Sequence, residues 1–187
     1  MALKRRFAVV FGTVMLGVVL SAAAQPAALV ADAARSGNLS AMRALLQQGA
    51  DVNEAQGDGM SALHWAAERG DRAMAEMLVF AGADVDAVTR IGDYSPLHIA
   101  STAGHTAVIQ LLLEAGANVS AVTSSSGASA LHFAAASGSA AAVVALLDSG
   151  ADVDALEGAW GQTPLIFAAS LNRVETVRTL LARGADP

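Results

Sequence analysis

The chain has 187 residues, of which 54% are apolar and only 4% aromatic, and it contains no cysteine, which excludes a disulfide scaffold, a cysteine-ligated metal site and a thiol enzyme. Its 17 acidic residues outnumber its 11 basic ones, which argues against a nucleic-acid binder because such a protein needs a basic face. The apolar content is too high for a disordered chain.

The first 24 residues have the three parts of a secretory signal peptide. Residues 4–6 are basic, residues 7–20 are uncharged and mostly apolar, and the triplet Ala22-Ala23-Ala24 fits the small-x-small rule of signal peptidase. We expect cleavage after Ala24 and export to the periplasm or the medium, with no stable membrane anchor left. The alternative is a retained anchor, but a membrane-spanning helix needs roughly 20 apolar residues. The pair Arg5-Arg6 leaves the Sec and twin-arginine export routes both open.

The rest of the chain repeats itself every 33 or 34 residues. A Gly-Ala-Asp or Gly-Ala-Asn string begins at Gly49, Gly82, Gly116, Gly150 and Gly184. Leucines recur at Leu63, Leu97, Leu131 and Leu165. A third ladder consists of Gly37, Gly70, Gly104, Gly138 and Asn172. Ladders that share this period indicate a solenoid of stacked supersecondary units.

The chemistry of one unit predicts two helices and a loop. Ser95 is a preferred N-cap, and Pro96 is tolerated at the first helical position because its missing N–H would have no partner there. The helix should end at Gly104, since glycine adopts the left-handed conformation without steric cost. A second helix should follow and end at Gly116, before a polar turn of roughly ten residues.

This unit closely resembles the ankyrin repeat. The resemblance rests on Ser95-Pro96-Leu97-His98-Ile99-Ala100, on Gly104-His105 and on the stretch from Leu111 to Val119, and it covers residues 26–187. It implies an all-α ankyrin-repeat solenoid of helix-turn-helix units linked by hairpin-like loops. The expected organisation is a capping helix pair at 25–49 and, within 50–187, four repeats at about 57–86, 90–120, 124–154 and 158–187.

Histidine stands at the third position of three predicted first helices, and the last unit has Ile166 there instead. A metal site is disfavoured because stacked helices lie about 8–10 Å apart whereas a zinc ligand lies about 2 Å from the ion. We therefore expect no metal and no cofactor. The resemblance implies that each ring ties adjacent turns together. The residues of this structural motif are Ser61, His64, Ser95, His98, Ser129, His132 and Thr163. His105, at a turn, is expected to be solvated.

Pairs of loop residues could suggest catalytic carboxylates or a calcium site. They are Asp51 and Asn53, Asp84 and Asp86, and Asp152 and Asp154. The calcium-loop pattern, the G-x-S-x-G nucleophile motif, a phosphate-binding glycine loop and a zinc-protease helix are all missing from the sequence. We therefore expect these side chains to bond turn amides, and we expect no enzymatic activity.

The few aromatic residues mark a candidate binding edge. Trp65 lies on a first helix and is expected in the core, whereas Tyr94 and Trp160 fall in turns whose tips should project along one edge. For Trp160 two interpretations stay open, an exposed anchor or a ring folded over the next turn. The partner-binding candidates are Asp58, Met60, Glu68, Arg69, Arg90, Asp93, Tyr94, Thr102, Trp160 and Gln162, with smaller neighbours Ala103, Ser125, Ala136, Ser137, Ser170 and Leu171.

These observations favour an exported, monomeric module that binds a protein partner through its concave, turn-tip edge. No stripe of charge marks a nucleic-acid or membrane face. The alternative is that the chain is the N-terminal recognition domain of a longer polypeptide with a catalytic or redox domain beyond residue 187. Residues 184–187 open another linking turn, so we expect the natural chain to continue past Pro187.

Overall fold

The computed structural model describes residues 29–187, so the expected leader at 1–24 lies outside the described residues. These residues form ten α-helices, and no β-strand occurs among them beyond an isolated bridge between Val122 and Ser129. None of these short helices has the length and apolar character needed to cross a bilayer. The helices are α1 (Leu29–Arg35), α2 (Leu39–Gln47), α3 (Ala62–Arg69), α4 (Arg72–Phe80), α5 (Pro96–Ala103), α6 (Thr106–Glu114), α7 (Ala130–Ser137), α8 (Ala140–Asp148), α9 (Pro164–Ser170) and α10 (Val174–Ala182).

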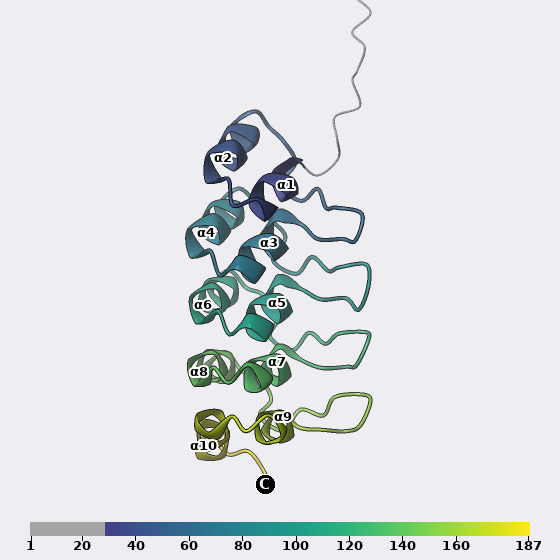
Figure 1. Cartoon of the computed structure of the whole chain (residues 1–187), viewed down its shortest axis with the longest axis vertical. Helices are drawn as coiled ribbons and strands as arrows, with labels where there is room; N and C mark the ends of the chain where they lie inside the picture. The colour runs from purple at the N-terminus through teal and green to yellow at the C-terminus, as the bar shows by residue number, and fades with distance from the viewer. Residues whose placement is uncertain (1–28) are drawn as a thin grey trace, which may run out of the picture.

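The helices form two layers that run the length of the molecule (Figure 1). The odd-numbered helices lie beside the long loops, which all project to the same side, and the even-numbered helices form the other layer. Each odd-numbered helix packs against the next odd-numbered one, and from α4 onwards each even-numbered helix packs against the next, while the two helices of each unit also pack together. This arrangement confirms the predicted all-α solenoid, in which each unit is stabilised by its neighbours.

The leucine ladder forms the core between the layers. Leu63, Leu97 and Leu131 on the odd-numbered helices are almost fully buried, and Leu165 is nearly so. Buried alanines repeat at the same period and let neighbouring helices approach closely. They are Ala66, Ala100, Ala134 and Ala168. Leucines from the even-numbered helices complete the core. They are Leu78, Leu112, Leu146 and Leu180.

The helix ends follow the signals in the sequence. The backbone N–H of His98 donates to the Ser95 hydroxyl oxygen over 3.4 Å, and Pro96 occupies the first turn of α5. Gly70 ends α3 with φ of 65°, in the left-handed region. In the last unit Asn172 takes the same conformation with φ of 56°, because asparagine tolerates this region better than most residues with a side chain.

Side chains of one unit close the helix ends of the unit before it. The His105 ring is half-buried, and its Nε2–H donates to the Glu68 carbonyl oxygen over 3.1 Å. The expectation that His105 is solvated is therefore wrong. The ring fits because Gly70 has no side chain: a Cβ there would lie 2.7 Å from the His105 Nδ1. Arg173 plays a similar part further along, since its Nε–H donates to the Ala136 carbonyl oxygen over 2.9 Å.

The contact between Gly70 and His105 predicts an unequal cost of two glycine substitutions. Gly70→Ala and Gly49→Ala both place alanine at positive φ, but nothing lies within 4 Å of a Cβ at position 49. Gly49→Ala should therefore cost only the backbone strain of about 1–2 kcal/mol. Gly70→Ala should cost at least about 1 kcal/mol more in urea unfolding, because it also displaces the His105 ring.

The control is the same pair of substitutions in a His105→Ala background. There the difference between the two positions should disappear, since the obstructing ring is gone. An equal loss of unfolding free energy at both positions in the wild-type background would contradict this description of the helix ends.

Candidate functional site

A histidine bridge connects each of three odd-numbered helices to the long loop that leads into the next unit. In α5 the His98 Nδ1 accepts the backbone N–H of Ser95 over 3.1 Å, and its Nε2–H donates to the Ala121 carbonyl oxygen over 3.0 Å. The corresponding bonds join His64 to Ser61 and Tyr94, and His132 to Ser129 and Gln162. These contacts require a neutral ring that carries its proton on Nε2.

Burial favours this neutral state. Desolvation lowers the pKa of His64, His98 and His132 below the ordinary value of 6.5, although hydrogen bonds to loop carbonyls oppose the shift. A second proton would place an Nδ1–H against the N–H of the preceding serine, so protonation removes one of the two bonds. In the last unit Thr163 caps α9, with its hydroxyl accepting the Ile166 N–H over 3.4 Å, but no histidine bridge follows.

The paired loop residues are occupied by backbone amides. The Asp84 carboxylate accepts the Asp86 N–H over 3.0 Å, and the Asp86 carboxylate accepts the Asn118 N–H of the next loop over 2.9 Å. Asp152 accepts the Asp154 N–H in the same way. Across residues 29–187, no three His, Asp or Glu side chains are grouped so that they could hold a metal ion.

The fourth position of α3, α5, α7 and α9, which follows the histidine in three units and Ile166 in the last, forms an apolar stripe that the sequence did not make obvious. Trp65, Ile99, Phe133 and Phe167 are spaced by 34 residues and are half-buried along the odd-numbered helices. The Phe133 ring lies 5.8 Å from the His98 ring, and the Phe167 ring lies 5.1 Å from the His132 ring, both edge to face. The period of this position was visible in the sequence and could have identified the stripe.

Trp65 differs from its expected role. It was expected in the core, but it is half-buried, with one part on the core and another on an open hollow. Its indole N–H donates to the Gln56 side-chain oxygen over 3.0 Å, and the Arg35 guanidinium lies 5.4 Å from its ring centre. α1, α4 and α5 pack against α3, and Trp65 lines the hollow that lies between α3 and α5.

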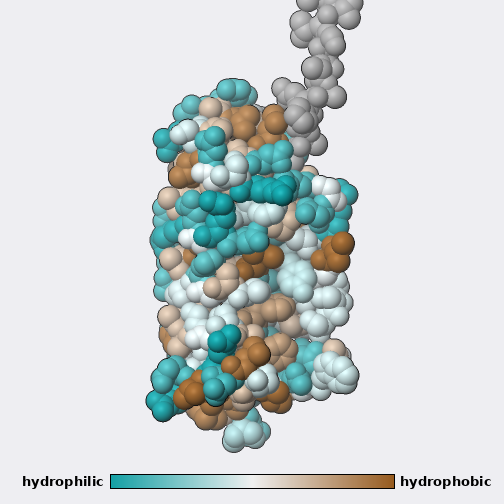
Figure 2. Space-filling view, in the orientation of Figure 1, coloured by the Kyte–Doolittle hydropathy of each residue, from teal (hydrophilic) through white to brown (hydrophobic). Residues whose placement is uncertain are grey.

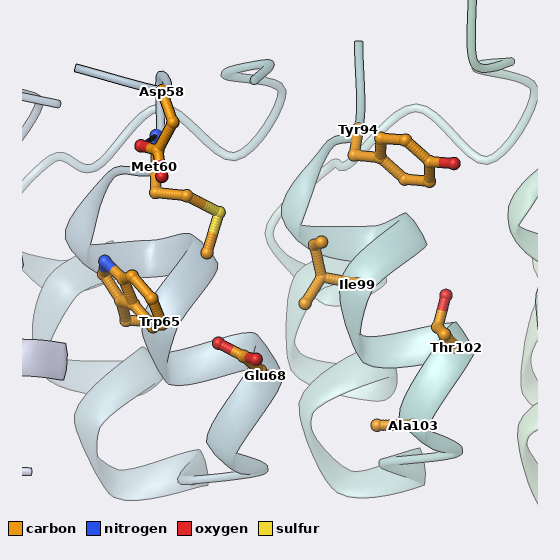
Figure 3. Close-up of a pocket in the computed structure, with 8 residues that line it drawn as sticks. All are labelled: Asp58, Met60, Trp65, Glu68, Tyr94, Ile99, Thr102 and Ala103. Carbon is orange, nitrogen blue, oxygen red and sulfur yellow. Dashed lines mark hydrogen bonds between the residues drawn. The ribbon is translucent and has the colours of Figure 1, made fainter. Parts of the chain in front are cut away.

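The hollow lies between α3 and α5, beneath the loop tips, and has a volume of about 540 Å³. Figure 3 shows that its side chains come from both helices and from the loops above them. Five of the partner-binding candidates meet there with three further residues. The lining residues are Asp58, Met60, Trp65, Glu68, Tyr94, Ile99, Thr102 and Ala103. The structure thus brings half of the predicted binding set into one place.

The other candidates lie elsewhere. Arg69 reaches toward α1 and donates to the Arg35 carbonyl oxygen over 3.4 Å. Arg90 and Asp93 are exposed in the loop between α4 and α5, and Gln162 is half-buried with its carbonyl in a histidine bridge. Tyr94 is less exposed than its turn position suggested, because its ring packs 5.8 Å from the Phe133 ring.

Trp160 projects from the loop between α8 and α9 and is 84% exposed, so it does not fold over a neighbouring turn. Glu157, which the sequence did not indicate as important, stabilises this turn. Its buried carboxylate accepts the N–H groups of Ala159, Trp160 and Gln162 over 2.7, 2.6 and 3.2 Å. Desolvation opposes ionisation of Glu157, but these hydrogen bonds prevail and lower its pKa below the ordinary value.

Polarity changes along the surface. Figure 2 shows hydrophilic residues over α3 and α4 and paler residues in the middle of the stack, around α5 and α7. The helix residues beside the stripe follow the same trend: Glu68 lies on α3, Thr102 on α5 and Ala136 on α7. The acidic side chains of the hollow therefore lie toward the N-terminal end of the stripe.

Two protein-family models match the chain. A model described as ankyrin repeats (3 copies) matches residues 97–187, and a model described as ankyrin repeats (many copies) matches residues 30–79. The two matches together reach into all ten helices of the described part. A search of curated proteins gives no match.

The histidine bridges predict a loss of stability in mild acid. Because the folded pKa of each ring lies below 6.5, the unfolded chain binds protons first as the pH falls. The contribution of the bridges to the unfolding free energy is fully present above about pH 7 and is lost as the pH falls below about 6.5. Between pH 7.5 and 5.5, the unfolding free energy in urea should fall, by at most about 1.4 kcal/mol per ring.

A His98→Asn variant serves as the control, because it removes one of the three titrating rings. Its unfolding free energy should be lower throughout, but its decline between pH 7.5 and 5.5 should be about one third smaller than that of the wild type. Wild-type stability that stays flat over this interval would contradict the neutral, buried bridges.

Proposed function

Because this chain belongs to the ankyrin-repeat family, whose repeats generally mediate protein–protein interactions, we propose that it binds a protein partner along its concave face. The concave face is defined here as the apolar stripe together with the loop tips beside it. The observation that carries the proposal is the stripe itself, Trp65, Ile99, Phe133 and Phe167, which is half-buried on the outside of a completed core.

The loop tips extend this apolar surface. Trp160 is 84% exposed and Ile91 is 82% exposed, and both belong to loops that project on the same side of the stack. Large apolar side chains surrounded by polar ones are typical of the residues that dominate binding at protein interfaces. The loops are tied to one another by backbone bonds, such as the one from Gly158 to Ser126, so little ordering would be required on binding.

Ankyrin-repeat proteins are typically non-enzymatic, and we propose the same for this chain. The buried titratable groups already have structural partners: the three histidines bridge helices to loops, and Glu157 holds a turn. This use of the polar groups supports a scaffold that presents a surface.

We also propose that the protein acts outside the cytoplasm, after export and removal of residues 1–24. The support comes from the sequence of that segment, with its basic start, short apolar run and Ala22-Ala23-Ala24 triplet. A chain without cysteine suits an oxidising compartment, because it offers no thiol to misoxidise.

Intact-mass spectrometry of protein from the exported fraction tests this proposal. The chain should begin at Gln25, because signal peptidase cleaves after small residues such as Ala24. Protein that retains Met1 and stays in the membrane fraction would show that the segment is an anchor instead.

The binding face is tested by a matched pair of substitutions. Ala103 and Ala182 are both exposed and are the last residues of α5 and α10, but only Ala103 lines the hollow on the concave face. With the protein as bait in the exported fraction of its host, Ala103→Arg should reduce capture of the wild-type partner at least about tenfold, because it obstructs a central contact.

Ala182→Arg introduces the same side chain and charge in the other layer and should capture the partner as the wild type does. Circular dichroism should show the same helical signal for all three proteins. Equal capture by wild type and Ala103→Arg, or a loss confined to Ala182→Arg, would place the interface away from the concave face.

A further inference from the structure

We propose that the hollow between α3 and α5 holds one arginine side chain from an extended segment of the partner. This inference rests on the proposed function of the concave face and names the chemistry that its central hollow recognises. It follows from the shape of the hollow, from its unpaired carboxylates and from the way Trp65 already contacts a guanidinium.

The hollow joins apolar walls to two negative charges. Met60, Trp65 and Ile99 supply apolar surface, and the carboxylates are those of Asp58 and Glu68. Figure 3 shows Asp58 at the loop end and Glu68 at the helix end of the same wall. No lysine or arginine is among the lining residues. A long side chain with an apolar stem and a cationic head matches both parts of this surface.

Neither carboxylate is neutralised within residues 29–187. The ion pairs there join Arg72 to Glu76, Arg178 to Glu175, and Arg183 to Asp148, all away from the hollow. One oxygen of Asp58 accepts the Met60 N–H over 2.9 Å. Its other oxygen and both oxygens of Glu68 have no hydrogen-bond partner in this part of the chain, so they are open to an incoming donor.

The nearby cations of the chain point elsewhere. The Arg69 side chain bonds a carbonyl of α1, and Arg90 is exposed in its loop without lining the hollow. Arg35 lies over Trp65, but it comes from α1, on the side of α3 away from α5. Residues 29–187 therefore place no cation of their own in the hollow, which leaves that position to a partner.

The contact between Arg35 and Trp65 favours arginine over lysine. A planar guanidinium stacks on an aromatic ring and offers a fork of N–H donors to carboxylates, whereas an ammonium is a strongly hydrated point charge. The indole N–H is already satisfied by Gln56, so Trp65 offers the hollow mainly its ring. A volume of about 540 Å³ also accommodates a side chain of this length.

The test uses short peptides of the form acetyl-Gly-Ser-X-Ser-Gly-amide, with X as arginine, lysine, citrulline or glutamate. Citrulline has nearly the shape of arginine without its charge. The full chain is labelled with ¹⁵N, and the Trp65 indole N–H and the Ala103 amide report binding. The arginine peptide should bind at least about fivefold more tightly than the citrulline and lysine peptides, and the glutamate peptide should cause no shift.

Glu68→Gln should weaken binding of the arginine peptide at least about fivefold and leave binding of the citrulline peptide unchanged. Glu114→Gln, which removes the same charge from an exposed position at the end of α6, is the control and should bind the peptide as the wild type does. Equal binding of arginine and citrulline, tighter binding of lysine, or no shift with any peptide would overturn the arginine assignment. The proposed function would still stand in those cases if Ala103→Arg abolishes partner capture.

Discussion

A hydrogen bond from a buried histidine to the next loop connects the units of this solenoid. In a stack where each unit contacts only its neighbours, stability depends on the bonds that cross from one unit to the next. The bridge from His98 to the Ala121 carbonyl is one such bond, and its ring is buried. Equivalent bonds occur at His64 and His132. Because the ring must stay neutral, packing and protonation are linked, and the same burial that strengthens the bond lowers the pKa of the ring.

The bridges also determine where the proposed binding surface lies. Each one fixes a loop against the start of an odd-numbered helix, and backbone bonds then join the loops, from Arg90 to Asp58 and from Ser124 to Gly92. The residue after each bridging histidine therefore has one side on the core and the other beside a loop, which positions Trp65, Ile99 and Phe133 of the stripe. Phe167 occupies the same position of the last unit, after Ile166 and without a bridge. A surface built on fixed elements pays little entropy on binding, which suits a recognition module.

The repeat period, the caps and the helix-ending glycines were predictable from the sequence because they depend on neighbouring residues. Ser95, Pro96 and Gly104 act within one turn of α5. The missed features depend on partners in other units. His105 bonds a carbonyl 37 residues away, and Trp65 is open to the hollow because of how α5 is placed. Glu157 was missed because a charged residue is seldom buried, and only the folded turn supplies the three amides that stabilise it.

The protonation state of the three bridging rings, measured by ¹⁵N NMR of the imidazole nitrogens, tests most directly whether neutral histidines connect the units. At pH 6.5 an unperturbed histidine is half protonated. We predict that His64, His98 and His132 are less than half protonated there because burial lowers the pKa of each ring, and that the neutral form carries its proton on Nε2. This proton should exchange slowly with water because it is bonded to a loop carbonyl. Rings that are half protonated or more at pH 6.5, or a neutral form with its proton on Nδ1, would contradict the claim that neutral histidine bridges hold the stack together.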